Sequence, residues 1–260
     1  MAPNRTDPPS PAPPGANVAV IGAGRLGTAL AAALRAAGVM VAGPLGRAEL
    51  PQGADAVLLC VPDSEIPAAA AAVAGGAPLL GHTSGATPLT ALAAGGAGAF
   101  GLHPLQTFSG GEGPDHFAGA GCAVSGDTSA ALELATTLAE RLGMTPFTIA
   151  DADRAAYHAA ASIASNFLLA LEATAEQVAG GAGLEPGEAR ALLAPLVRST
   201  VESWAARGPE RALTGPVARG DEATVARQRD AVAEAAPQSL ALFDELVART
   251  RVLAGREALL

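Results

Sequence analysis

The sequence contains no lysine. Its 16 basic residues are all arginines, they are outnumbered by 25 acidic residues, and the formal net charge is −9. Binding of nucleic acid or of an anionic membrane generally needs a basic surface, so we expect neither kind of partner. The absence of lysine also removes one of the common proton-transfer and nucleophilic groups from any catalytic mechanism.

Cysteine and aromatic residues are scarce. The 260 residues include two cysteines, Cys60 and Cys122, and only 3% are aromatic, although 50% are hydrophobic. Both cysteines lie in apolar runs. Because free cysteine is most often buried, we expect reduced core residues rather than a disulfide or a reactive pair. Much of the hydrophobic share is alanine, which favours helices packed closely through small side chains.

Long hydrophobic runs are also missing. No apolar run reaches the roughly 18 residues of a membrane span without a break by glycine, proline or charge. The segment 1–15 is rich in proline and lacks the apolar core of a signal peptide. We therefore expect a disordered tail over 1–15 on a cytoplasmic protein.

Strand-like and helical patterns alternate over residues 16–150, which predicts a doubly wound, mostly parallel sheet. Short apolar runs predict strands over 18–21, 39–42, 56–61, 78–82, 97–102, 121–125 and 145–149. Helical spacing predicts helices over 26–37, 66–73 and 129–142. We assign this α/β, Rossmann-type region as a dinucleotide-binding domain.

Strand signals stop at Asp151, so we expect an all-helical C-terminal domain over 151–260 for substrate binding and dimerisation. Its predicted helices cover 154–179, 186–207, 222–235 and 237–254, with a kink or boundary at Pro195. The segment 213–221, which contains glycine and proline, is expected to be a loop.

A glycine-rich turn, Gly22-Ala23-Gly24-Arg25-Leu26-Gly27, follows the first predicted strand and opens the first predicted helix. The spacing alone is weak evidence in a chain with 31 glycines, but this context is typical of a dinucleotide-binding turn. Gly22 permits the tight turn, Gly24 lets the backbone approach a pyrophosphate, and Gly27 allows close helix packing. The helix N-terminus offers free N–H groups to the phosphates. The alternative is a plain turn between strand and helix.

The second predicted strand ends without an acidic residue to hold a ribose 2′-hydroxyl. It is followed by Gly46-Arg47, and an arginine there suits a 2′-phosphate. We therefore predict NADP(H), with NAD(H) as the alternative, and Arg25 as a second phosphate contact. Arg47 has the simpler interpretation of a solvated residue at a helix start.

Three further segments follow predicted strands: 61–63, 82–85 and 103–108. Ligands of open α/β sheets bind beyond the carboxyl ends of the strands. We expect Val61, Pro62 and Asp63 to pass under the ribose and nicotinamide, and Ser84 and His103 to bring polar groups toward the reacting end. Short polar residues at such places also serve in turns and helix caps.

Polar residues form a stripe on the long helix predicted from residue 154. A helix turns by about 100° per residue around its axis. Measured around that axis from His158, Ser162 lies at about 40° and Asn166 at about 80°, while Ser165 lies about 20° in the opposite direction. Because buried polar groups need partners, the stripe indicates a polar cleft at the domain junction or against another subunit. In the functional hypothesis His158 is a general acid, while Ser162 and Asn166 orient the substrate. The alternative is a hydrogen-bonded helix–helix contact.

These features resemble the superfamily of 6-phosphogluconate dehydrogenase, ketopantoate reductase and pyrroline-5-carboxylate reductase. The closer resemblance is to a branch that joins a Rossmann-like domain to a C-terminal helical domain of unknown function. It is carried by His103-Pro104-Leu105-Gln106-Thr107-Phe108, by Tyr157-His158 followed by Ala-Ser-Asn-Phe-Leu, and by the segment 213–221 from Leu-Thr-Gly-Pro to Asp221.

In ketopantoate reductases a catalytic lysine, followed by asparagines four and eight positions later, lies on the first long helix after the Rossmann domain. By this resemblance, His158 stands at the position of the lysine, Ser162 at that of the first asparagine and Asn166 at that of the second. Since lysine is absent, an arginine such as Arg219 would have to hold a substrate carboxylate, and Asp221 would orient this arginine or the substrate.

The leading hypothesis is an NADP-dependent oxidoreductase that reduces a small 2-oxo acid or imine. The absence of lysine motivates the alternative, a non-catalytic dinucleotide-binding sensor or assembly protein. We expect no metal site, because the spacings of His82, His103 and His158 match no compact ligand motif. The resemblance and the alanine-rich C-terminal helices indicate a homodimer.

Overall fold

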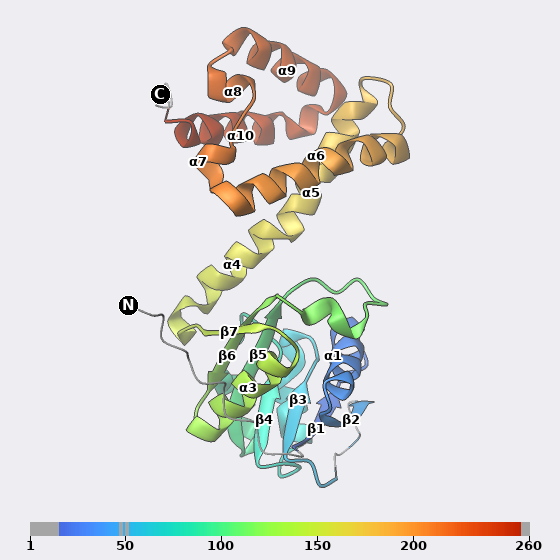
Figure 1. Cartoon of the computed structure of the whole chain (residues 1–260), viewed down its shortest axis with the longest axis vertical. Helices are drawn as coiled ribbons and strands as arrows, with labels where there is room; N and C mark the ends of the chain where they lie inside the picture. Colours follow the sequence, from blue (N-terminus) through green and yellow to red (C-terminus); the bar gives the residue numbers. More distant parts are fainter. Residues whose placement is uncertain (1–15, 47–48, 50–51, 256–260) are drawn as a thin grey trace, which may run out of the picture. The chain divides into compact units, whose positions relative to one another are not determined.

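The computed structural model describes residues 16–46, 49 and 52–255 (Figure 1). The chain divides into two compact units, one ending at Ile163 and the other beginning at Ala164. The sequence places the boundary earlier, between residues 150 and 151. The first turns of helix α4 (Arg154–Ala164) go with the sheet, because Arg154 is buried and its guanidinium donates to Ser125 Oγ at 2.9 Å.

In the described part of the first unit, seven strands form one sheet in the order β2-β1-β3-β4-β5-β6-β7. The strands are β1 Asn17–Ile21, β2 Met40–Leu45, β3 Ala56–Leu59, β4 Leu79–His82, β5 Gly98–Leu105, β6 Gly121–Gly126 and β7 Thr145–Thr148. Only β5 and β6 pair antiparallel, and the other neighbours are parallel. The prediction of a mostly parallel Rossmann-type sheet is therefore confirmed.

Helices cover both faces of the sheet. They are α1 Arg25–Ala36, α2 Ile66–Ala72 and α3 Ser129–Arg141, with short 3-10 turns η1 Asp63–Glu65, η2 Leu89–Gly95, η3 Pro114–Phe117 and η4 Asp151–Asp153. Successive side chains of a strand point to opposite faces, so Val18 and Val20 pack with α1 and α3, while Ala19 and Ile21 pack with α2 and η2. Burial on both faces explains why these strands are continuous apolar runs.

Both cysteines are free thiols of this unit. Cys122 on β6 is buried and Cys60, directly after β3, is half-buried. Burial raises the pKa of each thiol to about 12, so both stay protonated and unreactive at neutral pH. The predicted burial of Cys122 is confirmed, whereas Cys60, also predicted to be a buried core residue, is only half-buried.

The second unit is helical, as the sequence predicts. Its elements are α5 Asn166–Gly180, α6 Pro186–Arg207, α7 Pro209–Ala212, α8 Pro216–Arg219, α9 Glu222–Ala235, η5 Pro237–Ser239 and α10 Leu240–Leu253. Helix α6 continues through Pro195, so this proline is not a boundary. The expected loop 213–221 contains the single turn of α8. Within the residues that the structure describes, no helix is both long and apolar enough to cross a membrane.

The single helix predicted over 154–179 is wrong. Ser165 has φ −121° and ψ −74°, outside the helical region, and it separates α4 from α5. Residues after Ala164 therefore do not continue the helical spacing of α4, and angles calculated for one continuous helix do not apply to them. The predicted stripe is corrected accordingly: His158 and Ser162 lie on α4, whereas Asn166 begins α5 in the other unit.

Candidate functional site

The glycine-rich turn joins β1 to α1. Gly22 has φ +110°, and a Cβ there would collide with the carbonyl of Cys60. A Cβ on Gly27 would collide with the carbonyl oxygen of Gly22. A Cβ on Gly24 would meet no atom within 4 Å, so this position opens to free space. Gly22 and Gly27 are needed for the turn itself, and Gly24 leaves room for a ligand.

The start of α1 offers an anion site in the same place. Gly24 is the N-cap of this 12-residue helix and supplies no side-chain hydrogen bond to its first turn. The unpaired N–H groups and the positive end of the helix dipole therefore remain available to a negatively charged ligand. This arrangement fits a pyrophosphate.

A cleft of about 450 Å³ lies beyond the carboxyl ends of the central strands. It is lined by Gly24, Arg25, Leu26, Cys60, Val61, Asp63, Thr83, Ser84 and Phe108. The structure thus brings together predicted cofactor residues from the glycine turn, the end of β3 and the end of β4. The sequence prediction missed Cys60, Thr83 and Phe108, although Thr83 and Phe108 belong to segments that it singled out.

Ser84 connects two walls of this cleft through hydrogen bonds. Its hydroxyl lies 2.7 Å from Asp63 Oδ2 and 2.9 Å from Thr87 Oγ1, and it accepts hydrogen bonds from the backbone N–H groups of Ala86 and Thr87. Thr83 adds a bond from its hydroxyl to the carbonyl of Leu59 at 3.3 Å. The loops after β3 and β4 are therefore held together by hydrogen bonds.

Two arginines near the turn have different roles. Arg25 lines the cleft, and the region beside Gly110 is filled by its aliphatic stem. Arg35 instead donates to the carbonyls of Val41 and Gly43, which fixes the edge strand β2. Arg47, the predicted contact of a 2′-phosphate, lies outside the described residues.

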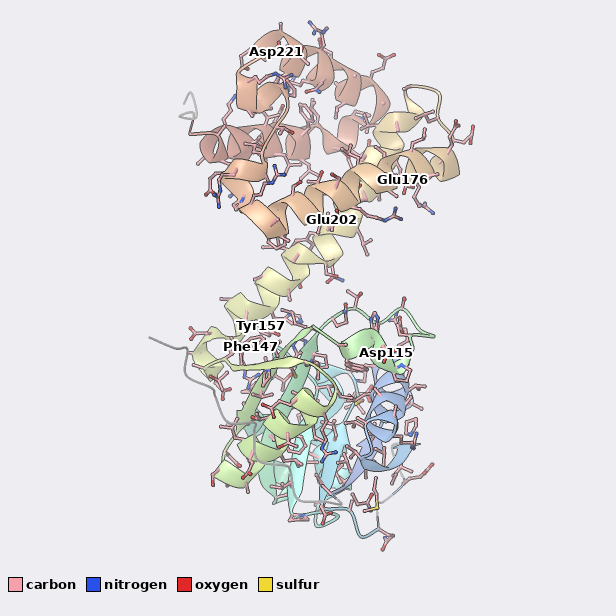
Figure 2. All side chains as sticks on the ribbon, in the orientation of Figure 1. Asp115, Phe147, Tyr157, Glu176, Glu202 and Asp221 are labelled. Carbon is pink, nitrogen blue, oxygen red and sulfur yellow. The ribbon has the colours of Figure 1, made fainter. Side chains whose placement is uncertain are left out.

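A second polar cluster joins β5 to α4. The hydroxyl of Tyr157 lies 2.7 Å from His103 Nδ1, and the two rings meet edge to face with centroids 5.5 Å apart. The ring of His158 is tilted against that of His103 at 6.4 Å. Tyr157 also packs edge to face on Phe147 of β7 at 5.9 Å, and Figure 2 labels this pair. The structure therefore brings His103 and His158 together and adds Tyr157.

His103 and His82 are both neutral at physiological pH. Burial lowers the pKa of His103 to about 4, and the charges of His158 and Arg154 act in the same direction. His82 is fully buried at the end of β4, and burial followed by the charge of Arg154 lowers its pKa to about 4. Arg154 is itself buried and pairs with Asp151 at 2.6 Å. The positive charge of Arg154 thus acts against protonation of both imidazoles.

The remaining predicted residues are placed as follows. Ser162 is half-buried on α4, His158 is exposed there, and Asn166 is exposed at the start of α5. Asp221 caps α9 by accepting from the N–H of Thr224 at 3.0 Å, so it has a structural partner of its own. Among the residues the structure describes, no three histidine, cysteine, aspartate or glutamate side chains converge as a metal site would need.

The fold is shared with solved structures of oxidoreductases. A proposed NADP oxidoreductase from Bacteroides fragilis is 22% identical, with 93% of this chain and 99% of that chain covered and a TM-score of 0.76. A pyrroline carboxylate reductase from Plasmodium falciparum with NADP bound is 13% identical. The match covers 88% of this chain and 99% of that chain, with a TM-score of 0.59. A reductive aminase from Aspergillus terreus in complex with NADPH and ethyl-5-oxohexanoate is 19% identical. The match covers 94% of this chain and 96% of that chain, with a TM-score of 0.61.

These identities establish likeness of fold. The shared fold is a Rossmann-type sheet followed by a helical part. A comparison with curated proteins finds no match. A family model described as "Domain of unknown function (DUF2520)" matches residues 120–250. The chain therefore belongs to the DUF2520 family.

Proposed function

We propose that the protein is an NADP-dependent oxidoreductase that reduces a small 2-oxo acid or imine. The observation that carries the proposal is the opening of Gly24 and the uncapped N-terminus of α1 onto a cleft beyond the strand ends. NADP and NADPH are bound by the Plasmodium falciparum and Aspergillus terreus proteins that share the fold, and this supports the choice of cofactor.

The residues of the cleft fit such a cofactor. In the proposal, residues 22–27 and Arg25 in particular hold the pyrophosphate, and Arg47 holds the 2′-phosphate. Val61, Pro62, Asp63 and Ser84 lie along the ribose and nicotinamide. The bound cofactor would supply the hydride that adds to the carbon of a C=O or C=N group.

The histidine cluster would serve the other half of the reaction. Reduction adds a proton to the substrate oxygen or nitrogen once the hydride has reached the carbon. His158 is exposed on α4 beside His103, so its ring is open to a ligand and to solvent. We assign the proton to His158, and Ser162 on the same helix remains a predicted hydrogen-bond partner of the substrate.

The first experiment titrates the purified protein with NADPH and NADH and then follows NADPH oxidation across a panel of 2-oxo acids and cyclic imines. On a confirmed substrate, His158→Ala should lower kcat by about 100-fold, in the range of general-acid catalysis. His158→Gln keeps a polar side chain of similar reach and should lower kcat as much, because it cannot supply a proton. Unchanged turnover in both variants removes His158 from the mechanism. Tight NADPH binding without turnover of any substrate favours the non-catalytic sensor.

We further propose that the protein is a homodimer through its helical unit. Large apolar side chains of this unit are exposed, among them Phe167 at 57%, Leu169 at 69% and Leu196 at 63%. Such a concentration of exposed apolar surface is uncommon in monomers. Light scattering should give a dimer mass for the wild type and a monomer mass for Leu169→Glu combined with Leu196→Glu. Met40→Glu, at a position 56% exposed in the first unit, is the control that should stay dimeric.

A further inference from the structure

We propose that Tyr157 is a positioning residue that holds His103 as the Nε2–H tautomer, so that neutral His103 donates a hydrogen bond to the substrate C=O or C=N group. This inference rests on the proposed function, and it gives the two histidines separate roles. His103 polarises the bond that receives the hydride, and His158 supplies the proton.

The tautomer follows from the contact between Tyr157 and His103. A neutral imidazole has one nitrogen that donates and one that accepts, and the hydrogen bond made by one nitrogen decides which carries the proton. The hydroxyl of Tyr157 is 2.7 Å from Nδ1. A phenol O–H is a better donor than a neutral imidazole N–H, and an imidazole nitrogen is a better acceptor than a phenol oxygen. The favourable arrangement therefore has Tyr157 donating to Nδ1, which places the ring proton on Nε2.

The surroundings of both residues keep them in these protonation states. Burial raises the pKa of Tyr157 to about 12, so its hydroxyl retains the proton that it donates. The groups that act on His103 are His158, Asp63, Arg154 and His82; only Asp63 favours the charged ring, and burial is the largest influence against it. His103 is therefore neutral at physiological pH and acts as a hydrogen-bond donor rather than a proton source.

The position of the ring depends on Gly85. A Cβ at Gly85 would lie 2.8 Å from Cε1, 2.9 Å from Nε2 and 3.0 Å from Nδ1 of His103, closer than real side chains approach. Gly85 thus lets the Cε1 side of the ring, with Nε2 next to it, rest against the loop after β4. The preceding residue, Ser84, lines the cleft. This contact brings the proposed donor atom to the same strand-end loop that would meet the nicotinamide.

The first test uses the ligand-free protein and needs no substrate. The chain has only four histidines, so a ¹⁵N-edited spectrum of the imidazole rings is simple, and a His103→Gln variant assigns the signal. The wild type should show His103 with an unprotonated Nδ1 and a protonated Nε2. Tyr157→Phe, which removes only the hydroxyl, should give a mixture of the two tautomers. A wild-type His103 with the proton on Nδ1 overturns the proposal.

The second test uses turnover. Tyr157→Phe should lower kcat about tenfold or more, because a misplaced donor loses transition-state contact, while KM for NADPH stays unchanged. Phe147→Leu removes an aromatic neighbour of Tyr157 but leaves its hydroxyl, and is the matched control that should retain most of kcat. Equal kcat in wild type and Tyr157→Phe overturns the donor role. A panel without any turnover overturns the proposed function, while the ring spectrum still decides the role of Tyr157.

Discussion

The hydroxyl of Ser84 lies 2.7 Å from the carboxylate of Asp63 and so joins the loops that follow β4 and β3. The two residues are neighbours because β3 and β4 are adjacent parallel strands. Both line the cleft proposed for the cofactor, so the hydrogen bond sets the distance between two of its walls.

Ser84→Ala should therefore weaken both the fold and the binding of NADPH. The change leaves the backbone N–H groups of Ala86 and Thr87 without an acceptor, which costs about 1–3 kcal/mol of the free energy of unfolding when such groups are buried. Urea denaturation measures the first effect and fluorescence titration the second. Ser162→Ala on α4 is the control for cofactor affinity. Wild-type affinity in Ser84→Ala would show that the loops are positioned without this bond.

The glycines of the turn should separate into two classes. Gly24→Ala meets no atom within 4 Å, so the free energy of unfolding should change by no more than about 1 kcal/mol, while the new methyl group hinders the pyrophosphate. Gly27→Ala must displace the carbonyl of Gly22 and should destabilise the fold itself. Thermal melts in parallel with NADPH titrations distinguish them. A Gly24→Ala protein that binds NADPH as well as the wild type would place the pyrophosphate elsewhere.

Acid should destabilise the protein before most carboxylates titrate. The pKa of His82 and of His103 falls from 6.5 to about 4 in the folded protein. Between these values the unfolded chain binds more protons than the folded one, so stability present above pH 6.5 is lost as the pH falls toward 4. For buried His82 the loss amounts to up to about 3 kcal/mol.

Urea midpoints measured at intervals from pH 7.5 to 4.5 test this, with His82→Gln as the comparison. The variant is expected to be less stable at neutral pH but to show a flatter pH dependence than the wild type. Identical slopes in the two proteins would mean that His82 is not held neutral by the fold.

The nucleotide preference should depend on Arg47. Arg47→Gln removes the charge predicted to pair with a 2′-phosphate, so the Kd for NADPH should rise about tenfold while that for NADH changes little. Competition titrations of the two nucleotides measure the ratio. Arg35→Gln is a poor substitute for this test, because Arg35 holds β2 through the carbonyls of Val41 and Gly43. A proportional loss of both affinities would assign Arg47 to a different part of the ligand.

Local patterns were sufficient to predict the strands of the sheet and the glycine-rich turn between β1 and α1. The run before Gly22 is apolar because β1 is buried on both faces, and Gly22 and Gly27 occupy places where the backbone excludes a side chain. These constraints act within a few residues, so they are visible in the sequence.

Two other features were not predictable in this way. The break at Ser165 lies between stretches with good helix propensity, and serine alone does not end a helix. The pair of Tyr157 and His103 joins residues 54 positions apart, on β5 and α4, so no local pattern brings them together. Tyr157 is the only tyrosine of the chain. Its position next to His158 in the sequence was the one available sign that it belongs to the histidine cluster.

The most direct test of the central claim is equilibrium titration of the wild-type protein with NADPH, with Gly24→Ala in parallel. The proposal predicts saturable binding at one site per chain in the wild type, tighter for NADPH than for NADH, and a Kd raised about tenfold or more in a fully folded Gly24→Ala protein. Absence of saturable NADPH binding by the folded wild type would contradict it.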